Sequence, residues 1–263
     1  MNKVEHHRTV WLSDVHLGSR ACRAGLLLDF LAHTRCDTLY LVGDIIDLRK
    51  LRNSIFWPRS HTDVLRRILE MSREGTRVLF VPGNHDEEFR AFAGVTLGPI
   101  AVEHQLIHTT ADGRRLLVLH GDEFDGLLKC GPLAAAIGHV GYRVLLTLNY
   151  LNHAVNELLG RPYWSLAQNV KMRIRGAVQY VSRFQNACMN AAREANVDGV
   201  VCGHIHKADI IERDGVTYCN DGDWVESCTA LVESHSGELS LRHWNQLAAT
   251  AVLQLPAPIR NAA

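Results

Sequence analysis

Apolar residues recur along the chain at two different spacings, and the two spacings alternate. Short, mostly apolar runs at 9–13 (TVWLS), 38–43 (TLYLVG) and 77–83 (RVLFVPG) have the length and composition of buried β-strands. Between them, 24–33 and 61–74 carry apolar residues at the spacing of amphipathic helices. Strands that alternate with helices predict βαβ units and a parallel sheet, so we expect an α/β (or α+β) fold class.

The second half of the chain shows another pattern. Asp112-Gly113 and Asp214-Gly215 are turn pairs that predict β-hairpins. Between the hairpins the sequence becomes helix-forming and poor in strand signals. We therefore expect a core formed by residues 1–125 and 196–247, a helical cap or lid insertion at 126–195 and a loose tail at 248–263.

Polar residues with metal-binding chemistry follow five of the predicted strands. In an open α/β sheet the carboxyl ends of the strands line the crevice where ligands bind, so motifs that are distant in the chain can converge there. The motifs are Asp14-Val15-His16, Gly43-Asp44, Gly83-Asn84-His85-Asp86, His120-Gly121-Asp122 and Gly203-His204-Ile205-His206.

Carboxylates, imidazoles and one amide suit divalent ions such as manganese, iron or zinc better than calcium. Residues i and i+2 of an extended segment point the same way, so Asp14 and His16 can reach one ion together. His204 and His206 can do the same, or divide between two neighbouring ions. Seven ligands exceed one tetrahedral site and fit two ions that share a carboxylate. Taken singly, most of these motifs would be plain turns, although Gly-Asn-His-Asp and above all Gly-His-x-His are less easily explained in that way. It is the combination of the motifs that favours a metal site.

Composition narrows the class of protein. The 263 residues are 47% apolar and 21% charged, as in globular proteins, and 28 basic residues balance 28 acidic ones. We therefore expect no nucleic-acid partner. The seven cysteines form no CxxC pair, which favours reduced thiols and a cytoplasmic protein. The chain shows neither an export signal nor an apolar run of membrane-spanning length, and it predicts no oligomeric state.

The segment 126–195 is basic, with eight Lys or Arg against two Glu. Basic and apolar helices can rest on an anionic membrane or hold a substrate with phosphates and acyl chains. The alternative is that its apolar residues pack on the core and its charges are solvated. Asn149, Asn152 and Asn156 share a predicted helix face that either binds a sugar or nucleotide or is simply polar. The candidate substrate-binding residues are Asn149, Asn152, Asn156, Lys171, Arg173 and Arg175.

The pair Asp221 and Asp223 allows two interpretations. Their carboxylates either support the metal-binding imidazoles from behind or merely form a turn.

The ordered motifs resemble those of the calcineurin-like metallophosphoesterases, and the match extends from residue 9 to about residue 243. The resemblance implies two mixed β-sheets flanked by helices and a dinuclear metal centre. It implies that Asp44 bridges the ions and that His85 acts beside them as the acid or transition-state contact, oriented by Asp86. The implied ligands are Asp14, His16, Asp44 and His206 for one ion, and Asp44, Asn84, His120 and His204 for the other.

A narrower resemblance, to the bacterial UDP-2,3-diacylglucosamine diphosphatase group, is carried by LYLVGDIIDL, VPGNHDE, VDGVVCGHIHKA and YCNDGDWVESCTALVE. It implies hydrolysis of a nucleotide-linked glycolipid in lipid A biosynthesis, giving 2,3-diacylglucosamine 1-phosphate (lipid X) and UMP. It implies two Mn²⁺ ions, with Fe²⁺ or Zn²⁺ as alternatives. It also implies a helical lid over the metals and a peripheral place on the cytoplasmic face of the inner membrane.

Two alternatives to this function follow from the sequence. The best-known members of the narrower group carry Arg where this chain has His85, the residue of the general phosphoesterase pattern. The same chemistry can therefore act on another nucleotide-linked or lipid phosphodiester or pyrophosphate. A non-catalytic scaffold is the other alternative, but a scaffold is expected to have lost ligands, and all seven positions here carry ligand-capable residues.

Overall fold

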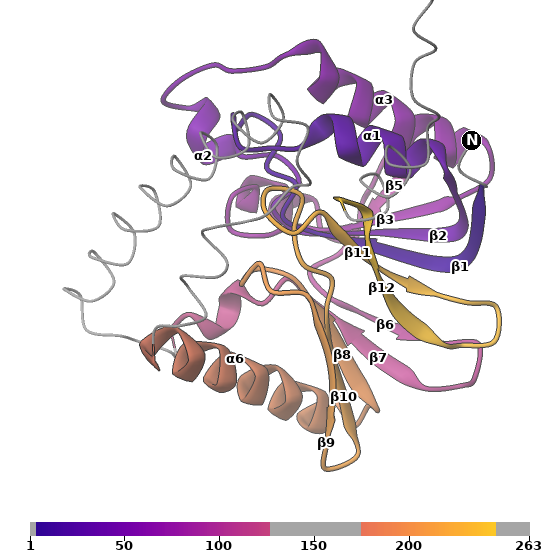
Figure 1. Cartoon of the computed structure of the whole chain (residues 1–263), viewed down its shortest axis with the longest axis vertical. Helices are drawn as coiled ribbons and strands as arrows, with labels where there is room; N and C mark the ends of the chain where they lie inside the picture. The colour runs from indigo at the N-terminus through magenta and orange to yellow at the C-terminus, as the bar shows by residue number, and fades with distance from the viewer. Residues whose placement is uncertain (1–3, 127–174, 246–263) are drawn as a thin grey trace, which may run out of the picture.

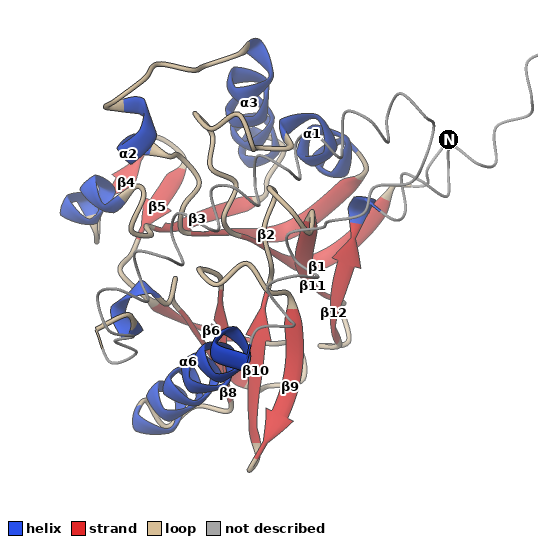
Figure 2. Cartoon of the chain, turned by 60° about the vertical axis from the view of Figure 1, so that its left-hand side comes forward, coloured by secondary structure: helices blue, strands red, loops and turns tan. Residues whose placement is uncertain are grey.

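Two β-sheets lie face to face at the centre of the molecule, with helices on the outer faces (Figures 1 and 2). The computed structural model of the chain describes residues 4–126 and 175–245, and the structural statements below concern these residues. The sheets are mixed and helices flank both, so the predicted fold class is confirmed. The predicted tail at 248–263 lies outside the described residues.

The larger sheet contains the three strands predicted in the first third of the chain. Its order is β12-β11-β1-β2-β3-β5-β4, in which β1, β2, β3 and β5 are parallel neighbours and β11 runs antiparallel to β1 and β12. The strands are β1 (Glu5–Leu12), β2 (Thr34–Val42), β3 (Arg77–Val81), β4 (Thr96–Leu97), β5 (Ile100–Val102), β11 (Thr229–Glu233) and β12 (Leu239–His243).

The smaller sheet has the order β6-β7-β8-β10-β9. Its strands are β6 (Leu106–Thr109), β7 (Arg115–Val118), β8 (Gly199–Cys202), β9 (Asp209–Arg213) and β10 (Val216–Asn220). The two predicted hairpins are confirmed, since β6 pairs antiparallel with β7 and β9 with β10. The parallel neighbours β7, β8 and β10 form the centre of this sheet.

Alternation along the central strands assigns each side chain to a layer. Val10 and Leu12 of β1 pack in the cluster beneath the outer helices, whereas Trp11 packs between the two sheets with Tyr40 of β2. Successive side chains of a strand point to opposite faces, so strands buried on both faces read as nearly continuous apolar runs.

Helices α1 (Ala24–Ala32) and α3 (Arg59–Arg73) cover the outer face of the larger sheet. On α3, Val64, Ile68 and Met71 recur every three or four residues and are buried, which confirms the predicted amphipathic helix. The other short elements are α2 (Leu48–Leu51) and the 3₁₀ turns η1 (Glu87–Phe92) and η2 (Asp122–Phe124).

Helix α6 (Arg175–Glu194) lies elsewhere than we expected from the predicted boundary between the insertion and the core. It falls inside the range that we assigned to the insertion, but it covers the outer face of the smaller sheet (Figure 1). Phe184 and Met189 are fully buried against Val200 of β8 and Tyr218 of β10. Residues 175–194 therefore belong to the core, because their apolar face completes a layer that the sheet needs.

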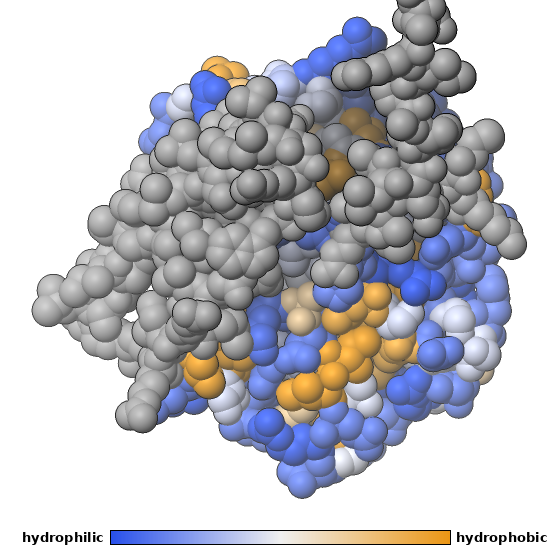
Figure 3. Space-filling model, viewed as in Figure 1, coloured by the Kyte–Doolittle hydropathy of each residue, from blue (hydrophilic) through white to orange (hydrophobic). Residues whose placement is uncertain are grey.

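The edge strands of the two sheets meet on one side of the sandwich. β12 ends the larger sheet, β9 ends the smaller one, and the two strands are in contact. Hydrophobic surface gathers near these strands in Figure 3. Ile210 of β9 and Leu241 of β12 are half-buried apolar residues of these two strands. No helix among the described residues has the length and apolar character required to cross a bilayer.

A buried polar network joins the sheets. The fully buried Glu233 of β11 accepts hydrogen bonds from Arg8 at 2.7 and 2.8 Å and from Thr9 Oγ1 at 2.6 Å. Across the sandwich it also accepts from His108 Nε2 at 3.0 Å and from the Ala111 N–H at 2.7 Å. A carboxylate buried in this way is stable only because every oxygen is hydrogen-bonded.

Candidate metal centre

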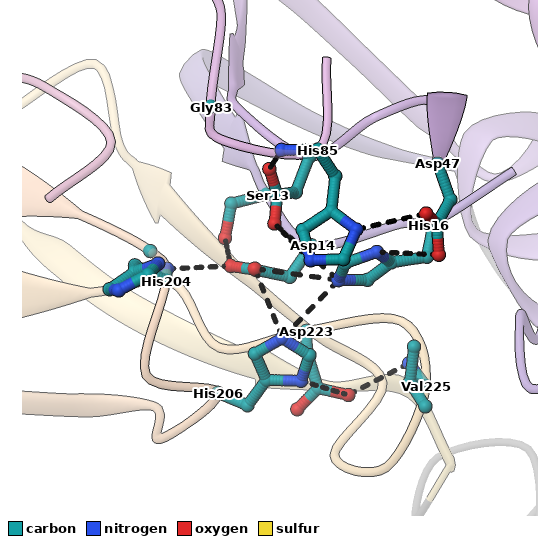
Figure 4. Close-up of polar contacts among 12 residues, drawn as sticks. Ser13, Asp14, His16, Asp47, Gly83, His85, His204, His206, Asp223 and Val225 are labelled. Carbon is teal, nitrogen blue, oxygen red and sulfur yellow. Dashed lines mark hydrogen bonds and ion pairs between the residues drawn. The ribbon is translucent and has the colours of Figure 1, made fainter. Parts of the chain in front are cut away.

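The polar residues predicted at the strand ends follow β1, β2, β3, β7 and β8, and most lie in one cluster (Figure 4). The loops are joined directly. The Asp14 N–H donates to the Gly43 carbonyl, and the Gly203 N–H donates to the His120 carbonyl. The His204 N–H donates to Asp14 Oδ2 at 2.8 Å and so connects the loops of the two sheets.

The cluster holds its members in strained backbone conformations. Positive φ values are uncommon outside glycine and are maintained only where surrounding structure enforces them. They occur at Asp14, His16, Asp44, His204 and His206, with φ between 51° and 69°. Such turns aim consecutive side chains inward at the ends of the strands.

Two groups of potential ligand atoms share Asp14. In the first, Asp14 Oδ1 lies 3.1 Å from His206 Nε2 and 3.8 Å from His16 Nε2, and these two imidazole nitrogens are 3.3 Å apart. In the second, Asp44 Oδ1 lies 3.5 Å from His120 Nε2, within reach of Asp14. Asp44 Oδ2 also lies 3.7 Å from His16 Nε2, so Asp44 faces both groups.

Several buried atoms of the cluster have no hydrogen-bond partner. They include Asp14 Oδ1, Asn84 Oδ1 and His120 Nε2. His120 donates from Nδ1 to the Val42 carbonyl at 2.8 Å, which directs the lone pair of Nε2 toward Asp44. Buried polar atoms without partners are rare and costly, and here oxygen and nitrogen lone pairs face one another. This donor set fits divalent cations.

Charge within the cluster also favours cations. Burial by itself would lower the pKa of His16, but the carboxylates of Asp14 and Asp47 raise it to about 10. Burial would likewise lower the pKa of His120, and Asp44 raises it well above its usual value. The carboxylates therefore create a strongly negative field at the centre.

A glycine lets the loops approach this closely. A Cβ atom at Gly83 would overlap the Asp44 carboxylate and would lie 2.7 Å from His120 Nε2. Any side chain at this position would therefore occupy the space between the two loops.

The residue that orients His85 in the structure is not the predicted one. We expected Asp86, but the Asp86 carboxylate is fully buried and accepts backbone N–H groups from the loops around it. Its donors are Gly83 N (2.7 Å), Asp44 N (3.2 Å), Ile45 N (2.8 Å) and Ile46 N (3.2 Å). Asp47 instead accepts from His85 Nδ1 at 2.9 Å and lies 3.6 Å from His16 Nδ1 (Figure 4). Asp47 follows the predicted Gly-Asp motif by three residues, and that spacing was its only signal in the sequence.

His204 lies next to the cluster, but its side chain is hydrogen-bonded to Asp125. Its Nε2 donates to Asp125 Oδ1 at 2.9 Å, and the Tyr180 hydroxyl donates to the same oxygen at 3.1 Å. The ring packs edge-on against His120, with centroids 5.2 Å apart. In the tautomer that donates from Nε2, the Nδ1 atom of His204 offers a lone pair that can bind a metal.

Asp221 and Asp223 differ in role. Ser13 Oγ lies 2.6 Å from both Asp14 Oδ2 and Asp221 Oδ1. The Ser13 hydroxyl, which can donate to either carboxylate, thereby links Asp221 to Asp14. Burial raises the pKa of Asp221 well above its usual value. Asp223 mainly accepts backbone N–H groups of its own turn, including Val225 N at 2.7 Å.

The predicted substrate residues are not placed by the structure. Arg175 begins α6, but its side chain is not among those described. Asn149, Asn152, Asn156, Lys171 and Arg173 lie outside the described residues.

A cluster of potential metal ligands at the strand ends of a two-sheet α/β sandwich is the arrangement expected of a metal-dependent hydrolase. The chain belongs to the calcineurin-like phosphoesterase family, whose sequence model matches residues 7–208. Members of this family use divalent metal ions, and the chain is a metal-dependent phosphoesterase or pyrophosphatase.

Relatives with a more specific name cover most of the chain. A UDP-2,3-diacylglucosamine hydrolase of Neisseria meningitidis serogroup A is 25% identical over 241 residues, covering 81% of this chain and 88% of the relative. The protein of the same name from Porphyromonas gingivalis is 25% identical over 252 residues, with the same two coverages. The one from Haemophilus influenzae is 23% identical over 255 residues, covering 87% and 95%.

Solved structures resemble the chain more distantly. A phosphoesterase from E. coli has 16% identity and a TM-score of 0.42, covering 89% of this chain and 98% of that one. Wild-type Vps29 of Entamoeba histolytica complexed with Zn²⁺ has 16% identity and a TM-score of 0.41, covering 89% and 96%.

Proposed function

We propose that the protein hydrolyses the pyrophosphate of UDP-2,3-diacylglucosamine to UMP and 2,3-diacylglucosamine 1-phosphate. The observation that carries the chemistry is the meeting of Asp14, Asp44 and His120 around buried atoms that lack hydrogen-bond partners. The substrate is supported by the shared name of the relatives.

The proposed ligands divide between two ions, most simply Mn²⁺, as the resemblance implies. Asp14, His16, Asp44 and His206 would hold one ion, and Asp44, Asn84, His120 and His204 would hold the other. The position of Asp44 beside both His16 and His120 supports its role as the bridge. When bound, such a pair activates water and offsets negative charge on phosphoryl oxygens.

His85 is the proposed proton donor. Its Nδ1 is held by Asp47, so its Nε2 points inward, where it lies 3.9 Å from Asp44 Oδ2. In the reaction the oxygen of water bonds to one phosphorus and gives up a proton to solvent, and the bridging oxygen leaves with the other phosphate. A proton from His85 Nε2 to that leaving oxygen would complete the step. Asp47 acts through His85, so it is a positioning residue.

The remaining expectations stay part of the proposal. Residues ahead of α6 in the predicted insertion would cap the site and carry five of the six candidate substrate-binding residues, and the sixth, Arg175, is the first residue of α6. The basic character of that segment supports peripheral contact with an anionic membrane. A cytoplasmic location is supported by the six described cysteines, all of which are free thiols.

Product analysis with purified UDP-2,3-diacylglucosamine and Mn²⁺ tests the proposal. We expect equal amounts of UMP and the lipid 1-phosphate, and neither without metal. Release of UDP would contradict the bond assignment. Turnover of a small aryl phosphodiester combined with no product from the lipid would favour the alternative, a phosphodiesterase or pyrophosphatase with another nucleotide-linked or lipid substrate.

A further inference from the structure

Lys50 places a positive charge beside the carboxylate that joins His16 and His85. Its Nζ atom lies 3.3 Å from Asp47 Oδ2 and donates a hydrogen bond to Ser19 Oγ at 2.8 Å. The backbone N–H of Lys50 also donates to Asp47 Oδ1 at 3.0 Å, which fixes the residue next to this carboxylate. An ammonium has three N–H donors, and the side chain is 55% exposed. A third donor is therefore available to a ligand that arrives from solvent.

The neighbouring cation has a different environment. Arg49 is exposed to a similar degree, 49%, but its guanidinium lies 3.5 Å from Glu87 Oε1, with which it forms an ion pair. Two adjacent residues of α2 thus carry the same charge, and Lys50 is the one directed to the cluster.

A diphosphate substrate poses an electrostatic problem that the metal ligands alone do not solve. The phosphate under attack would lie among Asp14, Asp44 and the imidazoles. The second phosphate is attached to it through one shared oxygen, so it must lie close by and brings further negative charge. Carboxylates without a bound ion repel that charge. A cation one carboxylate away from His16, as Lys50 is, is suitably placed to offset it.

We propose that Lys50 binds the phosphate of a diphosphate substrate that is not attacked, and so gives the site a preference for diphosphates. This inference rests on the proposed function, because it takes the cluster as the place of the attacked phosphate. On binding, the ammonium exchanges part of its contact with Asp47 for a charge-assisted hydrogen bond to a phosphate oxygen. No covalent step is involved.

Inorganic pyrophosphate and orthophosphate are the probes that isolate this contact, because they differ by one phosphate. Their dissociation constants are measured by titration calorimetry on the Mn²⁺-loaded full-length protein. We expect Lys50→Gln to weaken pyrophosphate binding about tenfold more than orthophosphate binding, the effect of one half-exposed charge-assisted contact. Arg49→Gln is the matched control, and it should leave the ratio of the two constants unchanged.

Three results would overturn the proposal. One is an unchanged ratio in Lys50→Gln, and another is an equal change in Arg49→Gln, which would indicate a long-range charge effect. The third is an equal loss of both ligands in Lys50→Gln, which would indicate that Lys50 only supports Asp47. The titration requires no turnover, so absence of UMP release from the lipid would contradict the proposed function without changing this comparison.

Discussion

The carboxylate of Asp47 accepts a hydrogen bond from His85 Nδ1 at 2.9 Å, and its other oxygen lies 3.6 Å from His16 Nδ1. One carboxylate therefore orients two imidazoles, one proposed as a proton donor and the other as a metal ligand. Asp47 is fully buried and caps the short helix α2, so its position is set by the fold rather than by the substrate.

Asp47→Asn should reduce kcat about 100-fold, because His85 loses the carboxylate that fixes its orientation and tautomer. KM should change much less, since Asp47 does not touch the substrate. Steady-state kinetics with an aryl phosphodiester measures both, and metal content is determined on the same sample because His16 is also affected. Asp63→Asn, on the outer helix α3, is the control. Full kcat in Asp47→Asn would contradict the role.

Metal binding should depend on His120 and Asn84. Replacing either residue with alanine removes a buried ligand atom that has no other partner. We expect the Mn²⁺ content, measured by elemental analysis after dialysis, to fall from two ions to one or fewer, with hydrolysis lost in parallel. His104→Ala removes an exposed histidine and should keep both ions. Loss of metal without loss of activity would refute the ligand assignment.

Asp86→Ala should destabilise the protein rather than act on the chemistry directly. The carboxylate accepts four backbone N–H groups from two loops, including Gly83 N and Ile45 N. Leaving these donors unsatisfied costs at least about 3 kcal/mol of unfolding free energy. Urea denaturation measures the loss, and Asp37→Ala, at an exposed carboxylate, is the comparison. Equal stability of the two variants would show that the bonds to Asp86 are dispensable.

Gly83→Ala tests the close approach of the loops. The new methyl group would overlap the Asp44 carboxylate and press on His120, so the proposed bridge would be displaced. We expect Mn²⁺ binding, followed by calorimetry, to weaken at least about tenfold, as for lost support of a ligand. Gly25→Ala, where a Cβ meets no heavy atom within 4 Å, should bind like the wild type. Normal Mn²⁺ binding by Gly83→Ala would show that the loops can accommodate a Cβ atom at this position.

Glu233 should make stability depend on pH. Burial alone would raise the pKa of its carboxyl group, but hydrogen bonds from His108, Thr9 and the Ala111 N–H lower it to about 2. The folded-state pKa lies below the ordinary value, so the stabilisation is present above about pH 5 and is lost as pH falls toward 2. We expect it to be about 2 kcal/mol at pH 7, after allowance for solvent screening.

The measurement compares urea denaturation of the wild type and Glu233→Gln between pH 7 and pH 3. The difference in unfolding free energy should shrink as the solution becomes more acidic. Glu238→Gln removes an exposed carboxylate from the neighbouring turn and should show little difference at any pH. A difference in unfolding free energy between the wild type and Glu233→Gln that stays constant down to pH 3 would contradict the lowered pKa.

The sequence by itself determined the order of the elements and the chemistry at the ends of the strands. Apolar runs such as those of β1 and β3 are buried on both faces, and period and composition reveal that without tertiary information. The ligand types at Asp14 and Asp44 could also be predicted, because the parallel strands of one sheet bring their carboxyl ends to one edge. His120 follows β7 of the other sheet, so its place beside them depends on how the two sheets pack.

Tertiary structure decided which partner each polar side chain faces. Asp86 follows His85 directly in the chain, yet its carboxylate accepts backbone N–H groups, and the hydrogen-bond partner of His85 is Asp47. Helix α6 has the composition of an insertion but packs as a core layer, because the smaller sheet has an apolar face to cover. Residue types and spacing follow from local sequence, but side-chain direction follows from turns with positive φ and from packing between distant segments, so only the folded chain fixes it.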